Sequence, residues 1–491
     1  MNVQHYIACD LGAESVRVIL GSLEDGKLAI EEVHRFENRP IRISGSLRWD
    51  VSRLFNELKT GLQAIARRGI SPASVSCDSW GVDYVLMRSD ASKFTPPYHY
   101  RDSRTDGALE SAFARVPAAE IFEETGIQFM PINTLYQILA DLRLQPDELH
   151  KAERFLNIGD YFNFLFSGVA KAEESLASTT QLYNPRKRAW SQALIREFGI
   201  PEHLFPEIVP SGTILGPLLS SIGEETGLRG IKVVAGCSHD TGAAVAAVPA
   251  QGEQWAYLSS GTWSLLGIES PHPIINKKSR EYSFTNEVGY GGKIRFLKNI
   301  VGLWVVQECR RHWANEGAVY GYEQLMEMAG TARPLVSLID PADERFSKPD
   351  NMPEKIASYC RESGQPVPGA PGAFVRCILE SLAHAYRRSL EQLEDVTGMS
   401  VAKLHVVGGG SKNRLLNQLT ANAIGRTVLA GPVECSAIGN VLIQAIALGH
   451  VSSLEAARDI VRSSFSVERF EPSRTGDWEN AAKHIQLPVH R

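Results

Sequence analysis

The sequence predicts an α/β protein built from two related halves. Residues 6–21 and 256–268 each have β-rich flanks around small turn residues, the pattern of a strand–turn–strand hairpin, and they lie about half a chain apart. Strand-like runs alternate with helical periodicity along the rest of the chain, which is typical of α/β folds. We therefore expect a first domain over residues 1–247 and a second over 248–491, each opening with a hairpin.

Local patterns predict the further elements. A helix is expected where apolar residues recur at helical spacing between a polar cap and a glycine, namely at Leu54, Leu58, Leu62 and Ile65, with Asp50 or Ser52 as the cap and Gly69 as the stop. Residues 75–87 predict a strand, a glycine-containing turn and a second strand. In the second half we expect a long amphipathic helix, a buried strand ending in glycines, a helix, a short strand and a helix, at 374–393, 404–410, 414–424, 427–432 and 436–448.

The bulk composition restricts the class of protein and its partners. Hydrophobic residues make up 43% of the 491 residues and charged residues 22%, as in an ordinary globular enzyme. A formal net charge of -5 gives no basic surplus for binding nucleic acid or an anionic membrane. The N-terminus lacks the pattern of a secretory signal, and no run approaches the ~20 apolar residues of a membrane span. We expect a cytoplasmic protein with neither nucleic acid nor membrane as a partner.

The seven cysteines show no metal or redox motif. None forms a C-x-x-C pair, so neither a zinc ribbon nor a thioredoxin-like site is indicated. Scattered cysteines in a cytosolic chain are usually reduced, buried and apolar in behaviour. Cys360 and Cys377 flank a Pro/Gly-rich loop and could form a bridge if oxidised.

One segment comes close to a nucleotide-binding P-loop but does not complete it. Residues 21–28, GSLEDGKL, have the glycine and Gly-Lys spacing, but Leu28 stands where the motif needs Ser or Thr. The segment also lies between two expected strands rather than before a helix. We interpret it as a hairpin turn, so any bound phosphate must be held in another way.

The tips of the two hairpins could hold phosphate. Small turn residues can direct several backbone N–H groups into one concavity, which suits phosphate oxygens. In the first hairpin, Asp10 could hold Mg²⁺ directly or through water, Gly12 allows close approach, and Ser15 offers a hydroxyl. The segment 260–262, Ser-Gly-Thr, repeats the scheme without the acid. An ordinary turn remains the alternative for each hairpin.

Two further motifs follow apolar strands. The triplet 408–410, Gly-Gly-Gly, would leave room for an adenine or ribose ring on the backbone, or would form a tight strand-to-helix turn. Asp240 follows His239 at the end of another strand and could accept a proton from a hydroxyl, or cap the next helix, or both. His239 alone is more often a hydrogen-bonded structural histidine. The HExxH and G-x-S-x-G motifs are absent.

Taken together, these motifs resemble the FGGY family of carbohydrate kinases over nearly the whole chain. The resemblance is carried by nine segments, which occur along the chain in this order: DLGAESVRV, CDSWGVDYVL, YRDSRT, TGIQFMPINTLYQ, SHDTG, YLSSGTWSLLG, LKNIVGLWVVQ, LHVVGGGSKNRLLNQ and GPVECSAIGN. It implies two RNase H-like domains, as in actin-like ATPases, around a central cleft.

The resemblance also implies an activity. TGIQFMPINTLYQ and LKNIVGLW are most similar to the branch that phosphorylates L-rhamnulose to L-rhamnulose 1-phosphate with ATP and Mg²⁺, in L-rhamnose breakdown. A kinase for L-fuculose, xylulose or glycerol is the first alternative. A nucleotide-dependent scaffold with an actin-like fold and a sugar-phosphate hydrolase are two others. The expected partners are the ketose and ATP, and the expected assembly is a monomer or homodimer.

Functional residues are carried over by motif. Asp240 would be the catalytic base, ionised at neutral pH by its ordinary pKa of about 3.9. Sugar contacts would come from Gly81, His239, Asp240, Thr241 and Asn299, and nucleotide contacts from Gly12, Ala13, Glu14, Ser15, Val16, Thr262, Gln307 and Gly409, with Asp10 near the metal. Glu14 and Val16 depart from the common Ser and Gly of the first loop. We expect Glu14 to point toward sugar or solvent, and Val16 to need no positive φ.

Overall fold

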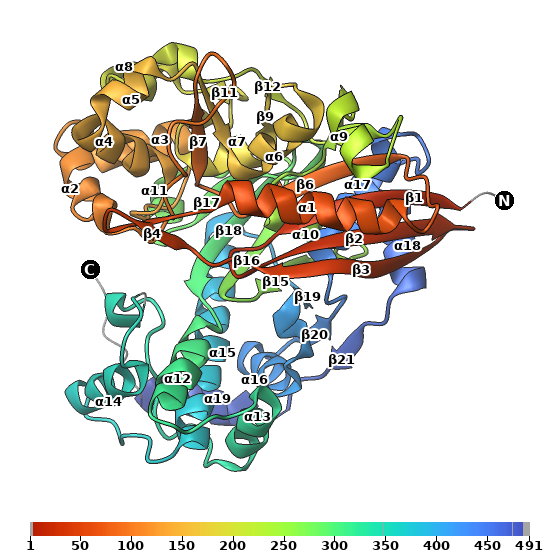
Figure 1. The fold of residues 1–491 in the computed structure, drawn as a ribbon. Helices are drawn as coiled ribbons and strands as arrows, with labels where there is room; N and C mark the ends of the chain where they lie inside the picture. Colours follow the sequence, from red (N-terminus) through yellow and green to blue (C-terminus); the bar gives the residue numbers. More distant parts are fainter. Residues whose placement is uncertain (1–2, 347, 474, 485–491) are drawn as a thin grey trace. The chain divides into compact units, whose positions relative to one another are not determined.

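The computed structural model describes residues 3–346, 348–473 and 475–484, which form two compact units (Figure 1). The first unit runs up to Pro249 and also contains Glu269–Phe296 and Cys435–Ser464. The second contains Ala250–Ile268, Leu297–Glu434 and the described residues from Phe465 onward. The N-terminal segment of the first unit thus ends at Pro249, close to the boundary expected after residue 247. The unit also includes two segments from the second half of the chain. The division of the chain into two domains between residues 247 and 248 stays a prediction.

The first unit is built on a mixed sheet. The strand order is β13-β14-β6-β1-β2-β3, with β1 Gln4–Leu11, β2 Ser15–Glu24, β3 Lys27–Glu37, β6 Ser74–Ser79, β13 Thr213–Pro217 and β14 Lys232–Ala235. β1 and β2 form the predicted hairpin, with Leu11 opposite Val16, whereas β1, β6 and β14 run parallel. The near-P-loop segment is indeed the turn between β2 and β3.

Helices cover this sheet because alternate strand residues face opposite sides. Ile7, Cys9 and Leu11 pack in one core with the apolar face of α1, Val51–Ala66, as the helical spacing predicted. Asp50 caps α1 by accepting from the Arg53 N–H, while Ser52 lies inside the helix. From the other half of the chain, α17, Cys435–Ala447, contacts β1 and β6, and α18, Leu454–Ser464, contacts β3.

Smaller elements of the first unit carry the loops around the site. The short strands are β4 Ile41–Ile43, β5 Ser46–Arg48, β7 Tyr84–Met87, β8 Arg154–Asn157, β9 Ala172–Glu173, β10 Tyr183–Asn184, β11 Ala189–Trp190 and β12 Ile208–Val209. The helices are α2 Ala108–Phe113, α3 Ala118–Thr125, α4 Thr134–Leu144, α5 Pro146–Lys151, α6 Ile158–Ser167, α7 Glu174–Ala177, α8 Gln192–Glu197, α9 Ser220–Thr226, α10 Asp240–Ala246 and α11 Lys277–Glu281. The expected strands within 75–87 are β6 and β7, and β7 pairs with β8.

The second sheet repeats the hairpin arrangement. Its order is β17-β18-β16-β15-β19-β20-β21, with β15 Trp255–Ser260, β16 Trp263–Ser270, β17 Thr285–Val288, β18 Ile294–Val301, β19 Lys403–Val407, β20 Thr427–Ala430 and β21 Glu468–Phe470. β15 pairs antiparallel with β16 and parallel with β19, as β1 does with β2 and β6. The expected repeat of a hairpin at the start of each half is therefore confirmed.

Long helices accompany the second sheet. They are α12 Trp304–Asn315, α13 Tyr322–Thr331, α14 Met352–Glu362, α15 Pro371–Thr397, α16 Arg414–Ile424 and α19 Thr475–His484. The predictions at 374–393, 414–424 and 436–448 thus fall on α15, α16 and α17. Cys360 and Cys377 are both buried free thiols in this unit, and the hydrogen bond between them lowers the pKa of Cys360. No helix in the described ranges is long and apolar enough to cross a membrane.

Candidate active site

Three carboxylates gather at one edge of the first sheet. In the parallel pair β1 and β6, Asp10 lies opposite Asp78. Beyond the end of β14, a parallel bridge joins His239 to Ser79, and the Ser79 N–H donates to the Ser238 carbonyl at 2.8 Å. Because the carboxyl ends of parallel strands meet at the same edge, Asp240 is brought beside Asp10 and Asp78, at the position where α/β sheets bind ligands.

The crowding of these acids changes their acidity. Burial raises the pKa of Asp78 well above its usual range, and the charges of Asp10 and Asp240 raise it further. Burial also raises the pKa of Asp240, the nearby charge of Asp10 adds to this, and His239 opposes it. The ordinary pKa expected for Asp240 from sequence is therefore too low. A raised pKa makes Asp240 a stronger base when it is ionised.

Asp10 has a cationic neighbour that sequence reasoning missed. Arg17 lies opposite it on β2 and donates to its carboxylate. Asp78 accepts from the Asn440 amide of α17 through Oδ2, and its Oδ1 has no hydrogen-bond partner among the described residues. Within the same residues, no group of three or more His, Cys, Asp or Glu is placed to hold a metal ion by itself.

Asp240 is the first residue of α10 rather than its cap. The N-cap position belongs to His239, and the Asp240 carboxylate accepts from the N–H and hydroxyl of Thr241. The alternative that Asp240 caps the helix is therefore wrong, although an acid in the first helical turn still interacts favourably with the helix dipole. Gly439 of α17 permits this helix to pack closely, since a Cβ there would lie 1.8 Å from the Ala243 carbonyl oxygen.

His239 is oriented by two buried charged residues that the sequence did not reveal. Arg295 on β18 is fully buried and donates from Nη2 to His239 Nδ1 at 2.9 Å. Glu287 on β17 pairs with Arg295 at 3.0 Å, and Arg295 is the leading charge that lowers the pKa of Glu287. His239 Nδ1 also lies 3.3 Å from a carboxylate oxygen of Glu287, so this buried ion pair places the imidazole ring. His239 Nε2 lies 3.5 Å from Asp240 Oδ1.

A buried acid also fixes the backbone of the loop before Asp240. Glu173 on β9 accepts from the Ser238 N–H at 3.0 Å and from the hydroxyl of Ser211 at 2.5 Å. It also accepts from the hydroxyl of Ser175, whose oxygen accepts in turn from the His239 N–H at 3.0 Å. These bonds hold the main chain of the loop, so the position of Asp240 does not depend on its own side chain alone.

The first hairpin tip matches part of what was expected. The Gly12 N–H donates to the Ser15 carbonyl at 3.0 Å, and the Gly12 carbonyl accepts from Asn38 at 2.9 Å, which closes a compact turn. Glu14 is exposed, in agreement with its expected direction. Val16 is fully buried in β2, and it is not among the residues with positive φ, as predicted.

Gly81 lies in the loop that continues β6. A Cβ at this position would lie 3.0 Å from the Thr179 hydroxyl oxygen, so close packing within the protein already favours glycine there. The sequence-based expectation gave a different reason, close approach of a sugar, and that role remains a prediction. The next residue, Val82, has φ of 68°, an unusual value for a β-branched residue.

The expected nucleotide residues lie in the second unit. At the tip of the β15–β16 hairpin, the Thr262 carbonyl accepts from the N–H groups of Gly302 and Trp304, which ties the tip to the start of α12. Gln307 lies on α12, and its buried Oε1 has no partner among the residues described. Asn299 is half-buried on β18 in the same unit.

The three glycines at 408–410 differ in how the surrounding structure explains them. Gly408 has φ of 82°, and a Cβ on Gly410 would lie 2.0 Å from the Ser260 hydroxyl oxygen. Both are therefore explained by the turn and by packing against the second hairpin. A Cβ on Gly409 would meet nothing within 4 Å. Packing therefore does not explain why residue 409 is a glycine. Gly409 is also the one residue of the triplet that the resemblance assigns to the nucleotide.

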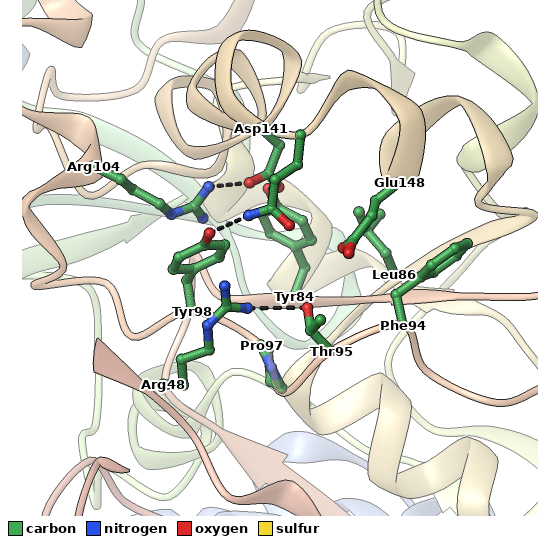
Figure 2. Close-up of a pocket in the computed structure, with 11 residues that line it drawn as sticks. Arg48, Tyr84, Leu86, Phe94, Thr95, Pro97, Tyr98, Arg104, Asp141 and Glu148 are labelled. Carbon is green, nitrogen blue, oxygen red and sulfur yellow. Dashed lines mark hydrogen bonds and ion pairs between the residues drawn. The ribbon is translucent and has the colours of Figure 1, made fainter. Parts of the chain in front are cut away.

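A separate small pocket lies in the first unit, shown in Figure 2. The guanidinium groups of Arg48 and Arg104 stand 3.6 and 3.8 Å from the centroid of the Tyr98 ring, and Arg104 pairs with the buried Asp141. Arg48 donates to Thr95 and to the Pro96 carbonyl. None of the sequence-predicted site residues lines this cavity, and its charged groups mainly anchor residues 95–104.

Comparison with known proteins identifies the class. Sequence models of the FGGY family of carbohydrate kinases match the chain in both halves, the N-terminal domain over residues 5–247 and the C-terminal domain over 256–448. Together with the acidic sheet edge, this establishes that the chain belongs to the FGGY family of carbohydrate kinases, enzymes that transfer a phosphoryl group to a sugar hydroxyl.

Curated relatives and solved structures agree with that assignment. A rhamnulokinase of Bacteroides thetaiotaomicron is 42% identical over 483 residues, covering 98% of this chain and 99% of the relative. A rhamnulokinase of Oceanobacillus iheyensis is 41% identical, covering 94% and 97%. A gluconate kinase of Lactobacillus acidophilus has the same fold, with a TM-score of 0.81 at 16% identity and coverage of 98% and 96%. A Plasmodium falciparum glycerol kinase with ADP has a TM-score of 0.80 at 14% identity, covering 99% of both chains.

Proposed function

We propose that this chain phosphorylates L-rhamnulose at its 1-hydroxyl with ATP, giving L-rhamnulose 1-phosphate. The main support is the near-complete match to rhamnulokinases at 41–42% identity. The solved gluconate and glycerol kinases, at 14–16% identity, support only the fold. The observation that carries the chemistry is the place of Asp240, a half-buried acid at the carboxyl edge of the first sheet.

In this proposal Asp240 is the general base. Its carboxylate orients the 1-hydroxyl of the sugar and takes the proton as the bond to phosphorus forms. The raised pKa brings its basicity closer to neutral pH, where a base is most effective. The contacts of His239 Nδ1 with Arg295 and Glu287 leave Nε2 on the side of Asp240, where it would contact a sugar oxygen.

The residues at the sheet edge fit a magnesium ion bound together with phosphate. Mg²⁺ usually takes one or two protein carboxylates and completes its shell with water and phosphate oxygens, so no all-protein cage is needed. Asp10 would hold it, with Asp78, whose Oδ1 lacks a partner in the described residues, as the second acid. The ion would neutralise charge on the phosphates.

The nucleotide is assigned to the remaining predicted residues. Backbone groups of the Gly12–Ser15 turn and the Thr262 tip would contact phosphate, in line with the use of small turns for anions. Gln307 and Gly409 would contact the rest of the nucleotide, since one has a buried oxygen without a described partner and the other faces open space. We further propose that the enzyme acts in the cytoplasm, where ATP is available, as a monomer or homodimer.

A panel of acceptors tests the substrate. Purified protein with ATP and Mg²⁺ is assayed on L-rhamnulose, L-fuculose, xylulose and glycerol, with the product identified by NMR. We expect the highest kcat/KM for L-rhamnulose and phosphorylation at O1. A higher kcat/KM for another acceptor would reassign the substrate within the family. ATP-independent phosphate release from the sugar phosphate would instead favour a hydrolase.

A further inference from the structure

The loop after β6 contains a strained turn. The Asp83 N–H donates to the Gly81 carbonyl at 2.9 Å, which closes a three-residue turn centred on Val82. Val82 has φ of 68°, and a γ-turn with positive φ at its centre is the rare, strained form. A β-branched residue tolerates this conformation poorly, so surrounding groups must hold it in place.

Two threonines from separate elements hold the Val82 peptide groups. The Thr134 hydroxyl at the start of α4 donates to the Val82 carbonyl at 2.6 Å. On the other side, the Thr179 hydroxyl oxygen accepts from the Val82 N–H at 3.2 Å, and the same side chain packs against Gly81. Both backbone groups of the strained residue are thus satisfied by side chains, which is how buried main-chain polar groups avoid a penalty.

The carboxylate of Asp83 joins this turn to an aromatic cluster. Its Oδ2 accepts from the indole N–H groups of Trp49 at 2.6 Å and Trp80 at 3.0 Å, and from the Tyr100 backbone N–H at 3.2 Å. Trp49 and Trp80 lie with ring centroids 4.3 Å apart. Asp83 is fully buried and has no ion pair at contact distance in the described part of the chain, so these neutral donors stabilise its charge.

The second oxygen of Asp83 is held by an amide that cannot turn over. Gln137 Nε2 on α4 donates to Asp83 Oδ1 at 2.8 Å, while Gln137 Oε1 accepts from Arg104 Nη2 at 2.8 Å. Arg104 is itself fixed by Asp141 and by the Tyr98 ring (Figure 2). Rotating the Gln137 amide would place its NH₂ against a guanidinium, so position 83 requires two acceptor oxygens.

We propose that Asp83 is a positioning residue for sugar binding, because it holds the strained Val82 turn and the Trp49–Trp80 wall in one arrangement that sets the Gly81 backbone. This inference rests on the proposed function, in which Gly81 contacts the sugar. One carboxylate receives a hydrogen bond from Trp80 of its own loop and from three segments distant in sequence, those containing Trp49, Tyr100 and Gln137. Its loss therefore displaces the sugar side of the site and leaves the base in place.

The test compares steady-state kinetics and ketose binding for Asp83→Asn and for a control. The substituted amide presents an NH₂ toward groups that already donate, so we expect the KM for L-rhamnulose to rise about tenfold to a hundredfold. The KM for ATP should stay within about twofold. Glu380→Gln removes a buried acid of the second unit that pairs with Arg376, and it should lower the melting temperature without changing the ketose KM.

Two further variants separate positioning from general stability. Thr134→Val keeps the volume but removes the bond to the Val82 carbonyl, and should raise the ketose KM in the same direction. Val82→Gly relieves the positive φ, so in the Asp83→Asn background it should recover part of the ketose affinity. If Asp83 were only structural, Val82→Gly would raise the melting temperature of the Asp83→Asn protein without changing its ketose KM.

The outcomes separate this inference from the proposed function. A wild-type protein that phosphorylates no ketose would overturn both. A wild type that prefers another ketose changes only the probe. If Asp83→Asn folds and keeps the wild-type ketose KM, or if it fails to fold and Thr134→Val keeps that KM, the positioning role is wrong.

Discussion

Asp10 and Asp78 occupy facing positions on neighbouring parallel strands. In the sequence they are far apart, because Asp10 lies near the start of the chain and Asp78 lies in the CDSWGVD motif. Their side chains project from the same edge of the sheet toward the place where Asp240 begins α10. The charge of Asp10 raises the free energy of ionising Asp78, because like charges in a poorly solvated site repel. A cation bound at the proposed magnesium site would relieve this repulsion.

Replacing Asp78 with Asn should stabilise the fold and weaken magnesium use. The folded-state pKa of Asp78 lies above its unfolded value, so the folded protein binds the extra proton and loses stability as pH rises through that window. Asp78→Asn removes this loss, and its melting temperature should fall less between pH 5 and pH 8 than that of the wild type. The Mg²⁺ concentration for half-maximal activity should rise about tenfold. A wild-type Mg²⁺ requirement would exclude Asp78 from the metal site.

Arg295 should matter through the orientation of the His239 ring. Arg295→Lys retains a buried cation for Glu287 but loses the planar fork that reaches Nδ1. We expect kcat/KM for the ketose to fall about tenfold or more. ¹⁵N NMR should show that the protonation pattern of the two His239 ring nitrogens changes from the wild type to the variant. Unchanged NMR signals and kinetics would show that Arg295 has no part in orienting the imidazole.

Asp83 should give the ketose affinity a dependence on pH. Burial raises its pKa to about 6, with Arg104 as the nearest opposing charge, while burial keeps the pKa of His99 at about 3 and that ring neutral. Below about pH 6 the protonated acid accepts hydrogen bonds less well, so the ketose KM should rise. Stability should move the other way, because a raised folded-state pKa favours the folded state as pH falls from 6 toward 4. Asp83→Asn should abolish the KM step, and a wild-type step retained in the variant would assign it to another group.

The glycine triplet offers a matched pair of substitutions. Gly409→Ala places its methyl group in open space, so the melting temperature should hardly change while the KM for ATP rises severalfold if the nucleotide lies there. Gly410→Ala drives its Cβ into the Ser260 hydroxyl, so it should be destabilised by about 1–3 kcal/mol. Thermal unfolding and ATP kinetics on both variants check this. A Gly409→Ala enzyme with wild-type ATP kinetics would remove Gly409 from the nucleotide site.

The sequence predicted the elements better than their assembly. Hairpins, the α1 helix capped by Asp50, and the helices after the glycine triplet follow from local patterns of period and capping, and each is present. The composition of the first unit does not follow in this way. Segments 269–296 and 435–464 join it through tertiary contacts that no local pattern encodes.

The residues of the candidate site likewise could be predicted from the sequence only in part. Asp240 and His239 were found because they follow an apolar strand in a recognisable motif, whereas Asp78 needed the β1–β6 register to be placed beside Asp10. Arg295 was missed because a fully buried arginine is rare, and nothing in its local sequence, IRFLK, distinguishes it from a strand residue facing solvent. Glu173 was missed for a similar reason, since its partners come from other loops.

The most direct test of the account is the turnover of Asp240→Asn. The amide keeps the size and the contacts with Thr241 but cannot accept the proton of the sugar hydroxyl. We predict that kcat for L-rhamnulose phosphorylation falls about 10²–10⁴-fold, with nucleotide binding measured by calorimetry unchanged. Wild-type turnover in a folded Asp240→Asn protein would contradict the assignment of Asp240 as the base.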